Sequence, residues 1–183
     1  PMWVGYYQML ECMYGKHPIR NRIAGTAETV AEITEETLQR AYACYYTTDE
    51  MALICAGDIP LGEVRRMAEH VARRETAARV YFPTEDAEIA EKFRAREMRL
   101  SVPQFQIGCK LPPLPKQDWL KKRMAAGFCM ELLAGESSVF FQKAYEWDWL
   151  DEALGSAFFC GEGYAFAAFS GSGTHPEETA DFL

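Results

Sequence analysis

Three histidines are the first residues to consider for chemistry, because zinc enzymes bind their metal largely through such side chains. They are His17, His70 and His175. The stretch Arg66–His70 reads Arg-Met-Ala-Glu-His, which has the Glu-His pair of an inverted His-x-x-Glu-His zinc motif but arginine at the first position. Because a guanidinium stays charged and only donates hydrogen bonds, it cannot bind zinc. We therefore predict a solvated helix surface here.

His17 and His175 each stand directly before a proline. Proline fixes its own backbone and restricts the preceding residue, so such pairs are typical of turns and helix starts. We predict a turn or packing role for His17, with contact to a substrate as the alternative. His175 is predicted to begin a helix. No catalytic, cofactor-binding or metal-binding residue is predicted in this chain.

The cysteines could act as nucleophiles, as metal ligands or as small core residues. No two have the Cys-x-x-Cys spacing of a zinc ribbon or a thioredoxin motif. Most lie in apolar runs such as Ala52–Ala56, where a thiol behaves as a small hydrophobic side chain. We predict buried thiols and a reducing, cytoplasmic location. The cysteines are Cys12, Cys44, Cys55, Cys109, Cys129 and Cys160.

An acidic cluster surrounds Trp147 and Trp149. Paired carboxylates can perform acid–base catalysis or bind a cation. Their alternation with tryptophan favours the end of a helix, where the indoles pack and the carboxylates face water. The acidic residues are Glu146, Asp148, Asp151 and Glu152.

Two glycine triplets, Gly161-Glu162-Gly163 and Gly171-Ser172-Gly173, raise the question of a phosphate-binding loop. Neither has the glycine spacing that phosphate loops place between a strand and a helix. We predict turns at both.

The composition excludes further classes of function. The 183 residues are 49% hydrophobic and carry a net charge of −8, so a packed core is expected and a basic face for nucleic acid is not. Basic residues at 65–74 and 121–123 alternate with apolar ones at helical spacing. We also find no signal peptide or transmembrane run in the sequence. Neither nucleic acid nor a membrane is a predicted partner.

The first part of the chain is predicted to be mainly helical. An apolar helix runs towards Gly15, and Thr26 and Thr34 are typical N-cap residues of two short helices. Residues 51–56 form a continuous apolar run ended by Gly57-Asp58, which is typical of a buried strand. Residues 61–74 fit an amphipathic helix. Its inner face is predicted to carry Val64, Met67, Ala68 and Val71.

Beyond a polar linker, the second part alternates strands and helices. Ser137 or Ser138 is expected to cap a helix, and a hairpin and a helix beginning at Pro176 follow. This last helix stops early at Leu183, so both ends of the chain are expected to be cut. The predicted strands are 97–102, 105–110, 153–160 and 164–170, and the predicted long helix is 117–133.

Several short motifs, in this order, resemble the pitrilysin/insulinase family of zinc metallopeptidases, the inverzincins. They are a His-Pro turn at 14–18, a Gly-Thr segment at 23–30, a helix start at 33–38, a Tyr pair at 45–46 and a run ending in Gly-Asp at 51–59. Residues 101–110, 132–141 and 163–173 resemble the family's second module more loosely.

The resemblance implies an α+β fold of the LuxS/mitochondrial-processing-peptidase-like metallohydrolase type. Residues 1–78 would be the C-terminal part of a first module, 79–95 a linker, and 96–183 the N-terminal part of a truncated second module. The family's zinc ligands precede the Gly-Thr segment, so zinc would be held upstream of this chain.

The function implied by the resemblance is that of a scaffold segment, which walls the substrate chamber of a zinc metalloendopeptidase and is inactive alone. The alternative is a segment of a non-catalytic family member that acts as a structural or partner subunit. The implied partners are a peptide substrate of the parent protein, the remainder of that protein or a paralogous subunit, and further copies of this chain.

Overall fold

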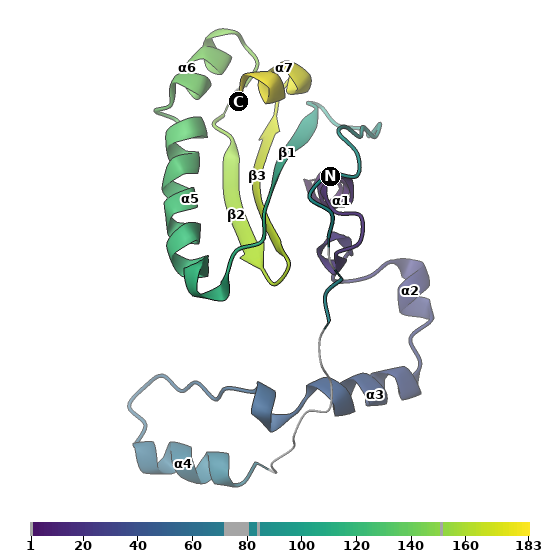
Figure 1. Cartoon of the computed structure of the whole chain (residues 1–183), viewed down its shortest axis with the longest axis vertical. Coiled ribbons are helices and arrows are strands. Elements are labelled where there is room, and N and C mark those ends of the chain that lie inside the picture. The colour runs from purple at the N-terminus through teal and green to yellow at the C-terminus, as the bar shows by residue number, and fades with distance from the viewer. Residues whose placement is uncertain (1, 72–80, 84, 151) are drawn as a thin grey trace. The chain divides into compact units, whose positions relative to one another are not determined.

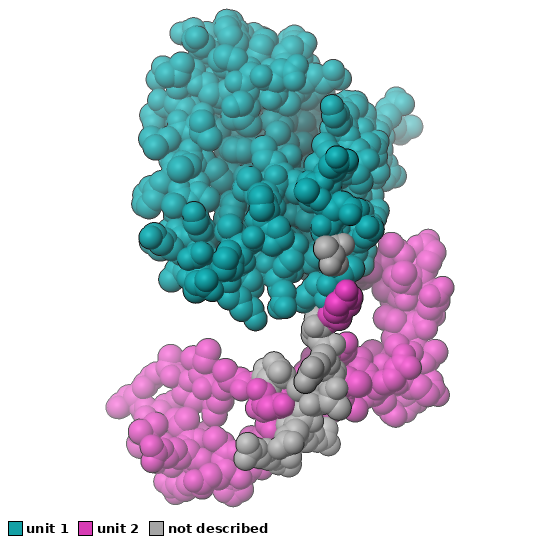
Figure 2. Space-filling model, viewed as in Figure 1, with its two compact units in different colours: residues 1–23, 82–183 teal, residues 24–81 magenta. Residues whose placement is uncertain are grey.

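The computed structural model describes residues 2–71, 81–83, 85–150 and 152–183. The chain divides into two compact units, which Figure 2 shows in different colours. The larger unit joins Pro1–Ile23 to Phe82–Leu183, and the smaller unit is Ala24–Tyr81. The two units are described separately below.

An antiparallel sheet forms the centre of the larger unit, with strand order β1-β3-β2 (Figure 1). The strands are β1 (Gln104–Leu111), β2 (Gly155–Gly161) and β3 (Tyr164–Ser172). Gly161 pairs with Tyr164, so only Glu162 and Gly163 connect β2 to β3. Gly163 has a φ of +80°, a backbone conformation that glycine adopts without steric cost.

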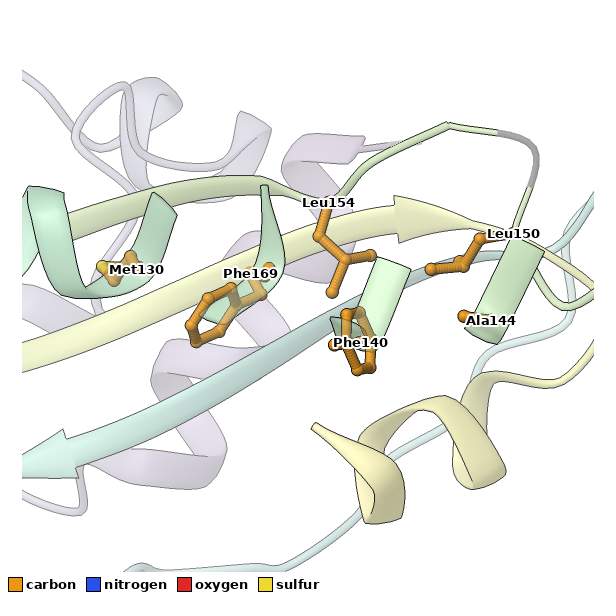
Figure 3. Packing of buried hydrophobic residues seen from close by; sticks show 7 residues of the cluster. Met130, Phe140, Ala144, Leu150, Leu154 and Phe169 are labelled. Carbon is orange, nitrogen blue, oxygen red and sulfur yellow. The ribbon is translucent and has the colours of Figure 1, made fainter. Parts of the chain in front are cut away.

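Helices cover both faces of this sheet, because successive side chains of a strand point to opposite sides. On β3, Phe169 and Ala167 pack into a cluster with residues of α5 (Trp119–Ala134) and α6 (Val139–Glu146). Figure 3 shows this cluster closely. Its buried members are Met130, Ala134, Phe140, Ala144, Leu150, Leu154 and Phe169.

The opposite face of the sheet carries α1 (Met2–Met13), the helix expected before Gly15. Phe166 and Ala168 of β3 pack there. Gly108 of β1 allows this close packing, because a Cβ atom at that position would lie 2.7 Å from side-chain atoms of both Met9 and Met13. The cluster comprises Met9, Leu10, Met13, Tyr14, Phe166 and Ala168. The sheet is therefore buried on both faces, between α1 and the α5–α6 pair.

The shorter elements of the larger unit begin largely where the sequence indicates. The single turns η1 (Pro18–Arg20) and η3 (Lys116–Asp118) follow prolines or contain them, and α7 (Pro176–Phe182) has His175 as its N-cap residue. At the start of α6, the buried Ser138 is the N-cap residue. Its hydroxyl accepts a hydrogen bond of 3.0 Å from the backbone N–H of Phe141.

Ser138→Ala is expected to lower the free energy of unfolding by about 1 kcal/mol, because the N–H of Phe141 loses its acceptor. Ser137→Ala, one residue earlier and exposed, is the matched control and should change it by less than about 0.5 kcal/mol. Urea unfolding followed by circular dichroism measures both. Equal effects at the two positions would contradict the assignment of the cap.

The smaller unit contains only helices among its described residues. They are α2 (Ala27–Ala31), α3 (Glu35–Tyr45), η2 (Thr48–Glu50) and α4 (Leu61–Glu69). The hydroxyls of Thr26 and Thr34 accept hydrogen bonds from the N–H groups of Thr29 and Thr37. Both predicted N-caps are therefore confirmed.

Two predicted strands are absent from the structure. Residues 51–56 and 97–102 are in neither a helix nor a strand, and both segments are exposed. A β-strand needs a neighbouring strand for its backbone hydrogen bonds, and the described part of the chain offers none to either segment. The prediction of a buried strand at 51–56, which rested on its apolar composition, is therefore wrong for the described structure.

The predicted inner face of α4 is also not buried. Met67, Ala68 and Val71 are exposed, and Val64 is half-buried. Residues 72–74 of the predicted helix lie outside the described residues. An amphipathic stripe is buried only where another surface meets it, and that surface is missing within the described smaller unit.

The mixture of helices and a three-stranded antiparallel sheet agrees with the predicted α+β class. The strands predicted at 105–110, 153–160 and 164–170 correspond to β1, β2 and β3, and the helix predicted at 117–133 corresponds to α5. The division at 1–78, 79–95 and 96–183 stays a prediction. Packing within one chain does not decide which module of a longer protein each segment belongs to.

Candidate functional site

Four donors of the larger unit converge on the carboxylate of Glu85. Its Oε1 accepts a hydrogen bond from the backbone N–H of Gly15 (2.8 Å), and its Oε2 accepts from the N–H groups of Lys16 (2.9 Å) and His17 (2.6 Å). Lys110 Nζ lies 3.3 Å from Oε1, and the two side chains are only 8% and 6% exposed. We call these five residues the Glu85 junction.

Lys110 joins the junction to the sheet, because it belongs to β1. Its ammonium also donates to the carbonyl oxygens of Asp86 (2.7 Å) and Glu88 (2.8 Å). It lies 4.8 Å from the centre of the Tyr14 ring, a cation–π contact. One lysine thus fixes the segment 85–88 to β1 and to the end of α1.

The hydrogen bonds determine the charge of Glu85. Burial alone would raise the pKa of this carboxyl, but the three backbone N–H groups and Lys110 lower it to about 2. A general base works best with a pKa near the pH of the reaction. Glu85 is therefore a permanently ionised anchor at neutral pH and a poor catalytic base.

His17 completes the turn that the junction holds. Its ring is buried and stacks on Phe82, with 5.2 Å between the ring centres. Nδ1 accepts from the backbone N–H of Ile19 (3.1 Å), so Nε2 carries the proton and donates to the carbonyl oxygen of Glu162 (2.9 Å). Both ring nitrogens are thus occupied. The predicted turn and packing role of His17 is confirmed.

His17→Ala is expected to lower the free energy of unfolding by roughly 2–3 kcal/mol, because the Ile19 N–H and the Glu162 carbonyl lose their hydrogen-bond partner and the buried ring leaves a cavity. The exposed His175 provides the control, and His175→Ala should cost less than about 1 kcal/mol. Thermal and urea unfolding measure the difference. A His17→Ala variant as stable as the unmodified chain would show that the turn does not depend on the imidazole.

A cavity of about 260 Å³ lies beside this turn. Its walls are mainly apolar and aromatic and come from α1, the His-Pro turn and β3. Burial raises the pKa of both Tyr6 and Tyr164, so their hydroxyls remain protonated and can only act as neutral hydrogen-bonding groups. The lining includes Tyr6, Tyr7, Leu10, His17, Phe82 and Tyr164.

The remaining histidines lie at exposed positions. His70 follows α4, and its Nδ1 is 2.6 Å from the carbonyl oxygen of Arg66. His175 lies at the start of α7, where its Nδ1 is 2.8 Å from the hydroxyl of Thr174. The structure thus places both histidines at helix ends, and the helix-start role of His175 is confirmed.

The acidic cluster has the arrangement expected of a helix end. Trp147 and Trp149 contact each other, with ring centres 4.7 Å apart, and Trp149 packs against the core of the sheet. Glu146, Asp148 and Glu152 are exposed, while Asp151 lies outside the described residues. The described carboxylates face water as predicted.

The turn predicted at Gly161-Glu162-Gly163 is confirmed, whereas the turn predicted at Gly171-Ser172-Gly173 is wrong because Gly171 and Ser172 belong to β3. Gly161-Glu162-Gly163 forms the connection between β2 and β3. Gly171 and Ser172 end β3, and a Cβ atom on Gly173 would collide with the carbonyl oxygen of Trp149. Glycine at 173 is explained by this close backbone contact.

The expectation that most cysteines are core residues was wrong. Only Cys12 is buried, whereas Cys55, Cys109 and Cys129 are exposed. Burial raises the pKa of the Cys12 thiol, which lowers its reactivity at neutral pH. The apolar neighbours of Cys55 are themselves exposed, and Cys129 lies on α5 between the exposed Phe128 and the buried Met130.

The described residues do not fit a zinc site. Among them, no three His, Cys, Asp or Glu side chains lie close enough together to hold a metal ion. The buried histidine, His17, uses both ring nitrogens within the fold. No step of metal chemistry is therefore assigned to this chain.

The Glu85 junction was not predicted from the sequence. Pro83-Thr84-Glu85-Asp86 is polar and acidic, and it was interpreted as part of a linker. The signal that points to Glu85 is the turn at Gly15–His17, where consecutive backbone N–H groups can converge on one anion. Nothing in the local sequence indicates which distant carboxylate binds there.

Comparison with known proteins places these features in context. Residues 32–183 match the family described as the peptidase M16 inactive domain. The chain is 27% identical over 188 residues to the uncharacterized zinc protease YmfH of Bacillus subtilis (strain 168), an alignment that covers 99% of this chain and 44% of YmfH.

The crystal structure of an M16-like peptidase from Alicyclobacillus acidocaldarius has the same fold. It matches 98% of this chain with a TM-score of 0.86 at 24% identity, and the match covers 44% of that protein. The chain therefore spans less than half the length of either relative.

Proposed function

The chain belongs to the peptidase M16 family, the pitrilysin/insulinase family that its motifs resemble, and on that premise we propose that it is a scaffold segment of a longer zinc-dependent metallopeptidase. In that protein it walls part of the substrate chamber and contributes no zinc ligand. The observation that supports this proposal most directly is that residues 32–183 match the inactive domain of the family. The relative named a zinc protease supports a peptidase as the parent protein.

The arrangement of the site supports a scaffold role. Glu85 is ionised and bound by four donors, and His17 uses both ring nitrogens in the fold. These two groups hold a turn in place and are themselves engaged within the fold. The zinc and the residues that hold it would lie upstream of Pro1, where they would supply the water-activating chemistry of the parent protein.

The finer architecture is part of the same proposal. We assign the fold to the LuxS/mitochondrial-processing-peptidase-like type, with 1–78 in a first module, 79–95 as linker and 96–183 in a second module. Two exposed apolar segments, 51–56 and α4, support this division, since both would be covered by the remainder of the first module.

A second candidate is a segment of a non-catalytic family member. It is favoured by the family match itself, which is to the inactive domain. The sequence of the gene upstream of Pro1, combined with an assay of the longer protein on quenched fluorescent peptides, separates the two. An intact His-x-x-Glu-His motif with chelator-sensitive cleavage supports the peptidase. A lost motif with no cleavage supports the structural subunit and contradicts our proposal.

The proposed partners are a peptide substrate of the longer protein and the remainder of that protein. The exposed apolar residues of the smaller unit also predict that the isolated chain self-associates. Light scattering across a range of concentrations tests this directly. The proposed location is the cytoplasm.

A further inference from the structure

The helix α5 has apolar side chains on both its inner and its outer side. On the inner side, Met130 and Ala134 are buried in the cluster that covers the sheet. On the outer side, four large apolar residues recur every fourth position and so form one stripe along the helix. They are Leu120, Met124, Phe128 and Leu132, with exposed fractions of 73%, 58%, 71% and 80%. We call them the α5 stripe.

Such a helix is normally buried on all sides, because a solvent-facing side is usually polar. Figure 1 shows α5 beside β2, which is the last strand on that side of the sheet. The sheet and the helix layer therefore end together on that side, and the exposed α5 stripe has no cover among the described residues. A further strand and helix beside β2 and α5 would continue both layers.

From this we propose that the α5 stripe is covered by an amphipathic helix from the part of the longer protein that lies outside this chain. The inference rests on the proposed function, because it needs the additional polypeptide. In both relatives the matched region is 44% of the protein, so more than half of the polypeptide remains to pack against this fold.

The charges around the stripe specify the chemistry of the partner. Lys121, Lys122 and Arg123 lie at its N-terminal end, in a chain whose net charge is −8. Among the described residues, none of the three takes part in an ion pair. The covering helix should thus carry acidic residues at the end that lies against Lys121–Arg123, with an apolar face along the rest.

A membrane fits the stripe less well. An 18-residue window within Lys116–Glu146 has a mean hydropathy of 1.2, which by composition is apolar enough for a membrane span. However, α5 has 16 residues and is about 24 Å long, whereas a bilayer core is ~30 Å thick. Its inner side is also occupied by the sheet.

Phe128→Glu in the longer protein tests the proposal. A charge on a covered surface should lower the melting temperature by roughly 5–10 °C, and Leu132→Glu should behave alike. Lys92→Glu, at an exposed residue outside α5, is the control and should shift it by less than about 2 °C. Shifts that match the control at both stripe positions would overturn the proposal.

A cysteine variant tests the proposal even if the Phe128→Glu and Leu132→Glu variants do not fold. In Leu132→Cys, peptide-resolved alkylation of the new thiol should be at least about 100-fold slower in the folded longer protein than in urea. Alkylation of the control Lys92→Cys, at an exposed residue outside α5, should be slowed less than about tenfold. Equal rates at the two positions would contradict a cover over the stripe.

Other occupants give different results. A longer protein that is a dimer, and that Phe128→Glu converts to a monomer, would show that a second copy covers the stripe. Binding of the longer protein to lipid vesicles, abolished by Phe128→Glu, would show that the stripe contacts a membrane. A gene that encodes only these 183 residues would contain no additional polypeptide to cover the stripe. Each result overturns the proposal. Neither the melting temperature nor the alkylation rate depends on zinc or on peptide cleavage. The two measurements therefore test the cover over the α5 stripe separately from the proposed peptidase function.

Discussion

Glu85→Gln is expected to lower the free energy of unfolding by about 3 kcal/mol at pH 7. The folded-state pKa of about 2, against an ordinary value of 4.5, corresponds to that much preferential stabilisation of the ionised carboxylate. The glutamine amide carries no charge, and its NH₂ group is a donor that cannot accept hydrogen bonds from the N–H groups of the turn. All four tryptophans lie in the larger unit, so fluorescence in urea measures its unfolding.

The exposed neighbour Glu88 provides the matched control. Glu88→Gln makes the same chemical change outside the junction and should cost less than about 0.5 kcal/mol. Lys110→Met removes one of the four donors to Glu85 and should cost about 1–2 kcal/mol, less than Glu85→Gln. If Glu85→Gln and Glu88→Gln were equally stable, the junction would not anchor the turn.

The pH dependence of stability provides an independent check. Because the pKa of Glu85 is lower in the folded state, its stabilisation is complete above the unfolded value of 4.5 and is lost as the pH falls towards 2. Roughly half of the difference between the unmodified chain and Glu85→Gln should remain at pH 3. A difference that does not change between pH 7 and pH 3 would contradict the role of the ionised carboxylate.

Phe166→Ala is expected to lower the free energy of unfolding by about 3–5 kcal/mol, the largest loss among these variants. Phe166 is fully buried on the α1 side of the sheet, where its ring stacks on Phe159 at 4.8 Å and meets Tyr14 at 6.1 Å. Truncation would leave a cavity between α1 and β3, two elements far apart in the sequence. Such a loss is a large part of the 5–15 kcal/mol by which ordinary domains are stable.

The exposed Phe93 is the control for this substitution. Phe93→Ala removes the same atoms from a side chain in contact with water and should change the free energy by less than about 0.5 kcal/mol. Hydrogen exchange of the α1 amides shows where Phe166→Ala acts. Faster exchange in α1, with Phe93→Ala unchanged, is the expected pattern, and unchanged α1 exchange would contradict packing of α1 through Phe166.

Local signals in the sequence predicted most of the elements. Thr26 and Thr34 were recognised as N-caps because capping involves residues only three positions apart. The β2–β3 hairpin was recognised because two apolar runs flank a short glycine turn. These features depend on neighbours in the chain.

Features that depend on distant partners were not predicted. The carboxylate of Glu85 meets N–H groups some seventy residues away, at |i−j| of 68 to 70. The run at 51–56 has the composition of a buried strand, yet it has no neighbouring strand among the described residues. Burial depends on what surrounds a segment, and a local pattern does not contain that information.

The central claim is that this chain is scaffold, with the zinc of its parent protein held elsewhere. Elemental analysis of the purified 183-residue chain, after equilibration with zinc and dialysis, tests the claim most directly. The expected result is far less than one zinc per chain, since the described residues gather no set of three ligands and His17 is occupied within the fold. One tightly bound zinc per chain would contradict it.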